Sequence, residues 1–100
     1  MSQWTIGNIK YANKQAGFYW FEPATLRFFA SRIGRNVYQG AGGIYFVSSE
    51  QFTESSGYTL GRKYTVRQFN PETGDVDTVG EFNKLSRSTA VREAQRLARG

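Results

Sequence analysis

One stretch of the sequence decides the fold that we expect: residues 63–82, KYTVRQFNPETGDVDTVGEF. Its two ends, 63–69 and 76–82, are rich in β-branched and aromatic residues, a composition typical of paired strands. Between them, Pro71 suits an early turn position, and Gly74 suits a late one where φ must be positive. The stretch therefore predicts an antiparallel hairpin.

The turn also predicts how the two strands are aligned. If the residues at its two ends face each other, every later pair along the hairpin follows. The predicted pairs are Asn70–Asp75, Phe69–Val76, Gln68–Asp77, Arg67–Thr78 and Val66–Val79. Because side chains alternate between faces, Arg67 and Thr78 share one face, and Gln68 and Asp77 share the other.

The segment that precedes residue 35 predicts a strand followed by a helix. Trp4, Ile6, Ile9 and Tyr11 are spread among polar residues, so we expect residues 1–16 to form a strand or an extended N-terminal arm. Residues 18–21 are all aromatic and predict a strand that is covered on both faces. A helix should then begin at Pro23, which suits the first helical position. Its expected apolar stripe is Leu26, Phe29, Ala30 and Ile33, and Gly34 suits its C-terminal cap.

The middle of the chain predicts one more strand and a loop. Val37-Tyr38 begins a strand or a turn, and the glycines of residues 40–43 bend the chain before a strand at 44–48. Residues 49–61 are polar and contain two glycines, so we expect a mobile loop there.

The last segment predicts a second helix. Ser86 or Ser88 can cap its N-terminus. The expected apolar stripe is Ala90, Val91, Ala94, Leu97 and Ala98. With the hairpin, these elements predict an α+β fold: one domain, residues 1–100, in which an antiparallel sheet of about three to five strands packs against two helices in the order β-α-β-β-β-α.

The residue types that are missing argue against catalysis. The 100 residues include no histidine and no cysteine, which removes the usual general base, thiol nucleophiles and thiolate metal sites. Glu72, Asp75 and Asp77 gather near one turn, but their spacing matches no calcium loop. We therefore expect a protein that is not an enzyme, with no catalytic residue, cofactor or metal.

The charges favour an anionic partner. Thirteen basic residues outnumber eight acidic ones, for a net charge of +5, and nine of the thirteen are arginine. Arginine suits bidentate contacts with phosphate. The candidate contacts with a partner or a nucleic acid are Arg62, Lys63, Arg67, Lys84, Arg87, Arg92, Arg96 and Arg99. Alternatively, the last three form a solvated helix face. Tyr45, Phe46 and Tyr64 could stack on bases or lie in the core.

No signal peptide and no apolar run long enough to cross a bilayer is evident, so we expect a cytoplasmic protein without a membrane partner. The oligomeric state is left open by the sequence.

Two segments of the chain resemble a family of short uncharacterised proteins of bacteriophages and other mobile elements. The first runs from Phe21-Glu22-Pro23 through Val37-Tyr38 to Glu50, and the second from Arg62 to Phe82. The resemblance covers roughly residues 17–99. It implies an accessory protein in the cytoplasm of an infected or host bacterium, which binds and inhibits a host protein or nucleoprotein complex, such as an anti-CRISPR.

The C-terminal half is also similar in layout to known nucleic-acid-binding domains. Strands followed by an alanine-rich helix resemble AP2-type and integrase arm-type DNA-binding domains, and the order of elements is similar to that of double-stranded-RNA-binding domains. The alternative function is therefore direct DNA or RNA binding through the basic helix and the hairpin.

Overall fold

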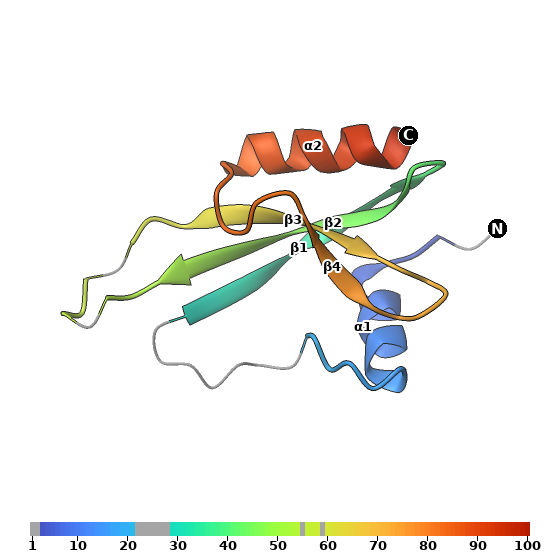
Figure 1. Ribbon diagram of the computed structural model, residues 1–100, viewed down its shortest axis with the longest axis horizontal. Coiled ribbons are helices and arrows are strands. Elements are labelled where there is room, and N and C mark those ends of the chain that lie inside the picture. The colour runs from blue at the N-terminus through green and yellow to red at the C-terminus, as the bar shows by residue number, and fades with distance from the viewer. Residues whose placement is uncertain (1–2, 22–28, 55, 59) are drawn as a thin grey trace.

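The computed structural model describes residues 3–21, 29–54, 56–58 and 60–100, and for residues 29–31 it describes the backbone alone. Its elements are α1 (Ile6–Gln15), β1 (Phe29–Gly40), β2 (Gly43–Phe52), β3 (Lys63–Phe69), β4 (Val76–Val79) and α2 (Arg87–Arg99). The strands form an antiparallel sheet in the order β1-β2-β3-β4, with α1 and α2 on opposite faces (Figure 1). The predicted α+β class, with an antiparallel sheet and two helices, is confirmed.

The hairpin has the predicted register. β3 pairs with β4 through Val66–Val79, Arg67–Thr78, Gln68–Asp77 and Phe69–Val76. The amide of Asn70 donates to the carbonyl of Asp75 at 2.9 Å, and Gly74 closes the turn with a φ of 83°. The second strand is shorter than predicted, because Gly80 has a φ of 76° and turns the chain away from β3 after Val79.

Two apolar clusters lie on the two faces of the sheet. Alternation along β2 sends odd-numbered side chains toward α2 and even-numbered ones toward α1. The cluster under α2 has the buried members Tyr45, Val47, Val66, Ala90, Ala94 and Ala98. The cluster on the α1 side has Ile9, Phe46, Phe69 and Val76, with both tryptophans packed against it.

The N-terminal segment corrects the prediction of an arm or strand within residues 1–16. Residues 6–15 form α1, because Thr5 and Asn8 form a reciprocal capping box at its first turn. Ile9 and Asn13, four residues apart, lie on its buried face. The side chain of Asn13 donates to the carbonyl of Gly74 at 2.8 Å and accepts from the amide of Trp20 at 2.8 Å, which ties the helix to the hairpin turn.

The helix predicted to begin at Pro23 is wrong in its second half. Residues 29–40 form β1, whose backbone pairs with β2 along most of its length. Ile33 and Val37 pack on the α1-side cluster, and β-branched side chains suit such a surface. Strand pairing thus overrides the helical spacing that ends at Gly34. Residues 22–28, including Pro23 and Leu26, lie outside the described part of the chain.

The loop predicted at 49–61 begins later than expected. β2 continues through Phe52, because Ser49 and Glu50 pair with Tyr64 and Lys63 of β3. The predicted bend at residues 40–43 is the turn between β1 and β2. The mobility of the remaining segment stays a prediction.

The C-terminal helix matches its prediction closely. Ser86 caps α2 by accepting a hydrogen bond from the amide of Thr89. Three alanines of α2 are buried against the sheet, which lets the helix approach the β1–β2 turn. There, the Gly42 amide donates to the Ala98 carbonyl at 3.0 Å.

Gly42→Ala should destabilise the fold. A Cβ at this position would overlap the Leu97 carbonyl oxygen, a backbone atom that cannot move without shifting α2. We expect the free energy of unfolding, measured by urea denaturation, to fall by about 1–3 kcal/mol, as at other overpacked sites. Gly61→Ala is the matched control, because its Cβ would meet no atom within 4 Å. Equal stability of the two variants would contradict the close approach of α2.

Candidate functional site

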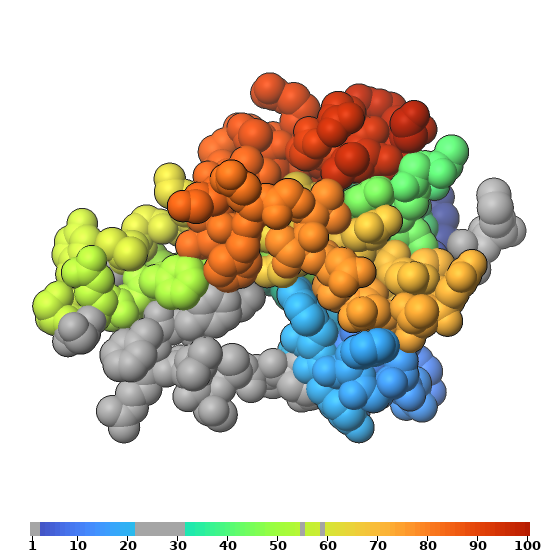
Figure 2. All heavy atoms as spheres, in the orientation of Figure 1, coloured from blue at the N-terminus to red at the C-terminus, as the bar shows by residue number. Residues whose placement is uncertain are grey.

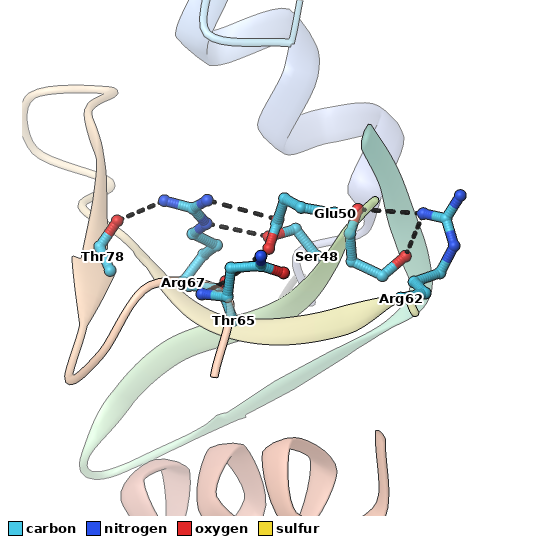
Figure 3. Close-up of polar contacts among 8 residues, drawn as sticks. Ser48, Glu50, Arg62, Thr65, Arg67 and Thr78 are labelled. Carbon is cyan, nitrogen blue, oxygen red and sulfur yellow. Dashed lines mark hydrogen bonds and ion pairs between the residues drawn. The ribbon is translucent and has the colours of Figure 1, made fainter. Parts of the chain in front are cut away.

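A buried polar network occupies the α1-side face of β2, β3 and β4 (Figure 3). Glu50 is fully buried and accepts from the hydroxyls of Ser48 and Thr65, each at 2.6 Å. Arg67 donates through Nη2 to Glu50 at 3.4 Å, through Nε to Ser48 at 2.9 Å, and through Nη1 to the Thr78 hydroxyl. One connected set of hydrogen bonds thus holds the three strands together.

Aromatic rings and burial complete the surroundings of Arg67. The guanidinium carbon lies 5.0 Å from the ring centroid of Trp20 and 5.3 Å from that of Phe82, so each ring face offers a cation–π contact. Burial lowers the pKa of Arg67 from its ordinary value, and the charge and hydrogen bond of Glu50 oppose that shift. Since each guanidinium nitrogen has an internal partner, this group stabilises the fold.

Arg67, one of the predicted contacts with a partner, therefore lies in the core of this structure. The residue is only 7% exposed. Its alternation in β3 puts it on the same face as Thr78, as the predicted register requires, but that face is covered. Charge alone could not reveal this, because a paired, buried arginine and a solvated one look alike in sequence.

A basic pocket of about 130 Å³ lies on the opposite face, between the edge strand β1 and the first turns of α2. Its lining includes three arginines, Arg32 and Arg35 from β1 and Arg87 from α2. Asn36, Ser49 and the rings of Tyr38 and Tyr64 complete much of the wall. We call this site the arginine pocket.

Two local features bring these arginines together. The pairing of β1 with β2 is interrupted between Ile33 and Val37, and such an irregularity re-aims side chains. This break carries Arg35 into the pocket. Arg87 precedes Val91 by four residues, about one helical turn, so it lies on the sheet-facing side of α2 and not among the outward arginines.

Ser49 adds a hydrogen-bond donor to the pocket. Its hydroxyl oxygen accepts from Nη1 of Arg62 at 3.0 Å, and the same nitrogen lies 3.3 Å from the Ser49 carbonyl oxygen. Nη2 of Arg62 donates to Gln51 at 3.3 Å. The Ser49 hydroxyl proton has no acceptor among the described residues, although the residue is only 7% exposed. Arg62 thus places a fourth positive charge behind a hydroxyl that is free to donate.

No carboxylate lines the arginine pocket among the residues that the structure describes. Within the same ranges, Arg32, Arg35 and Arg87 form no ion pair. The nearest acidic residue in β2, Glu50, follows Ser49, so alternation sends its side chain to the other face, where Arg67 neutralises it. The positive charge of the pocket is therefore not neutralised by any described carboxylate and is available to an anionic ligand.

The other predicted contact residues do not line this pocket. Arg92, Arg96 and Arg99 are exposed on the outward side of α2, which forms one border of the molecule (Figure 2). The Arg96 guanidinium pairs with Glu93, and this hydrogen bond lowers the pKa of that carboxyl group. Lys63 and Lys84 are also exposed. Of the predicted contact residues, Arg87 lines the pocket, Arg62 donates to Ser49 in its lining, and Arg67 lies in the core.

The structure resolves the alternatives for two of the three aromatic residues and leaves Tyr64 open. Phe46 is fully buried and Tyr45 is 6% exposed, so both belong to the core and cannot stack on bases. Tyr64 is half-buried and lines the arginine pocket.

Sequence reasoning missed Arg32, Arg35 and Ser49. The predicted helix contains Arg32 and ends before Arg35, and the predicted loop contains Ser49. A strand prediction for residues 32–38, with Arg32 opposite Ser49, could have found the site. It would have placed these charged side chains on the edge of the sheet that lies beside α2.

The described residues show neither a group of three acidic side chains that could hold a metal ion nor a helix long and apolar enough to cross a membrane.

An α+β sheet protein with a basic pocket beside its C-terminal helix is the class that this geometry defines. Within that class, the chain belongs to the family of unknown function DUF7447, whose model matches residues 5–97. No curated protein and no solved structure matches the chain. The function therefore has to be argued from the site itself.

Replacing Glu50 with glutamine should be strongly destabilising. It leaves the buried Arg67 charge without its counter-charge, and breaking such a pair costs about 3–5 kcal/mol. Glu93→Gln, which removes the carboxylate of an exposed pair, is the matched control and should leave the stability unchanged. Thermal and urea unfolding of both variants measure the difference. A Glu50→Gln protein as stable as the control would show that the network contributes little.

Proposed function

We propose that this protein is a non-enzymatic binding module that contacts the phosphates of a nucleic acid, free or within a nucleoprotein complex, through the arginine pocket. The carrying observation is that Arg32, Arg35 and Arg87 line one pocket, and that none of its described lining residues is acidic. Guanidinium groups bind phosphate oxygens in a bidentate way, and contacts of this kind provide most of the affinity of proteins for nucleic acids.

Other positive charges on α2 support this proposal. Arg92 and Arg99 form no ion pair among the described residues and lie farther along the helix that supplies Arg87. They would add contacts that depend on charge and not on geometry. The net charge of +5 favours the approach of an anionic partner over a long range.

A second candidate function is inhibition of a host protein or nucleoprotein complex, as by an anti-CRISPR. It rests on the resemblance to phage proteins and on exposed aromatic residues near α1. Tyr11, Phe18 and Tyr19 are 68%, 47% and 53% exposed, and aromatic side chains are enriched at protein interfaces. Loss of inhibition in a CRISPR interference assay with the Tyr11→Asp/Tyr19→Asp variant would favour this candidate. Absence of any inhibition by the native protein would remove it.

The proposed function predicts binding of short DNA or RNA that weakens steeply with salt. In fluorescence anisotropy, the logarithm of the association constant should fall linearly with the logarithm of the salt concentration. Arg35→Glu/Arg87→Glu should abolish most of the affinity. The same variant should reduce that slope by about 0.7–0.9 for each phosphate that its side chains no longer neutralise.

Arg92→Glu/Arg99→Glu is the matched control, because it changes the net charge equally on the outward side of α2. We expect it to weaken binding less than the pocket variant does. If neither DNA nor RNA binds at low salt, the proposal fails. If the two variants weaken binding equally, the charge acts without the pocket.

A further inference from the structure

We infer that the arginine pocket takes the terminal phosphate monoester of a nucleic-acid strand, in preference to the phosphodiesters along its backbone. This inference rests on the proposed function and narrows it from phosphates in general to a strand end. It follows from the size of the pocket, its charge and its donors.

The size of the pocket favours a small group at the end of a chain. Its volume of about 130 Å³ is well below the roughly 300–1,000 Å³ of pockets that hold drug-sized ligands. It is bounded by β1 on one side and by α2 on the other, with Val47 and Val91 in its lining. A phosphate that enters between these elements fits best if the nucleic-acid strand continues from it on one side only. At a phosphodiester, the strand continues on both sides.

The charge of the pocket suits a dianion. A phosphate monoester carries a charge of about −1.5 to −2 at pH 7, whereas a phosphodiester carries about −1. Three arginines line the pocket, a fourth, Arg62, donates to the Ser49 hydroxyl, and the described lining residues include no carboxylate to offset these charges. The second negative charge of the monoester can therefore pair with guanidinium groups that form no other ion pair among the described residues.

The pocket also has more hydrogen-bond donors than the two non-bridging oxygens of a phosphodiester require. A monoester presents three terminal oxygens, and a diester presents two. The pocket offers the forks of Arg32, Arg35 and Arg87, and the Ser49 hydroxyl, whose oxygen Arg62 already holds in place. The third oxygen thus has a donor available. Tyr38 and Tyr64, in the same lining, offer ring faces to the first nucleotide of the strand.

The test compares oligonucleotides that differ only in their ends. Single strands of DNA and RNA carrying a 5′-phosphate, a 3′-phosphate or free hydroxyls at both ends are titrated by anisotropy at about 0.15 M salt, where screening is physiological. We expect a phosphate at one of the ends to tighten binding at least tenfold. Arg87→Gln should remove this preference, and Arg92→Gln, which lies on the outward side of the same helix, should retain it.

The outcomes separate this inference from the proposed function. Equal, salt-dependent binding of all three strands overturns the terminal-phosphate site and leaves nucleic-acid binding in place. Absence of binding by every strand overturns both. Tighter binding of a phosphoserine peptide than of any phosphorylated strand also overturns the inference. Should Arg87→Gln unfold, as judged by circular dichroism, Arg35→Gln serves instead.

The preference should also depend on pH. The second pKa of a phosphate monoester is near 6, so the ligand becomes a monoanion as the pH falls below that value. The advantage of the phosphorylated strand should therefore be largest near pH 7.5 and clearly smaller near pH 5, where the end group keeps one negative charge, whereas binding of the unphosphorylated strand changes little. A preference of the same size at both pH values would contradict recognition of the dianion.

Discussion

The ion pair between Arg67 and Glu50 is the constraint on which the rest of the structure depends. A buried charge is costly unless it is paired and fully hydrogen-bonded, and here both partners are satisfied through Ser48, Thr65 and Thr78. Because Glu50 lies in β2 and Arg67 in β3, a shift of one residue in that pairing would separate the charges, and a shift between β3 and β4 would separate Arg67 from Thr78. The pair therefore fixes the register of the sheet.

The fixed register assigns the two faces of the sheet to different tasks. On the α1 side, Glu50 and Arg67 neutralise each other beneath Trp20 and Phe82. On the α2 side, Ser49 meets arginines from β1, from the N-terminal flank of β3 and from α2, and no carboxylate. Small residues at Gly42 and Ala98 let α2 lie close to the sheet, so that Arg87 reaches the wall of the pocket.

The sequence predicts the hairpin and the last helix well because local rules govern both. Turn chemistry fixes the register at Gly74, and an alanine stripe with Ser86 fixes α2. β1 depends on a partner farther along the chain: residues 29–40 are a strand because β2 lies beside them, against their helical spacing. The same dependence limits how much of the site the sequence can predict. The sheet, and not a local pattern, buries Arg67 and brings Arg35 into the same pocket as Arg87.

We propose that the arginines divide into a structural one in the core and a binding set in the pocket. NMR spectra of the arginine Nε–Hε groups, recorded during titration with a 5′- or 3′-phosphorylated oligonucleotide, test it most directly. We expect large shifts for Arg32, Arg35 and Arg87, and none for Arg67, whose Nε already donates to Ser48. Shifts confined to Arg92, Arg96 and Arg99 would contradict it.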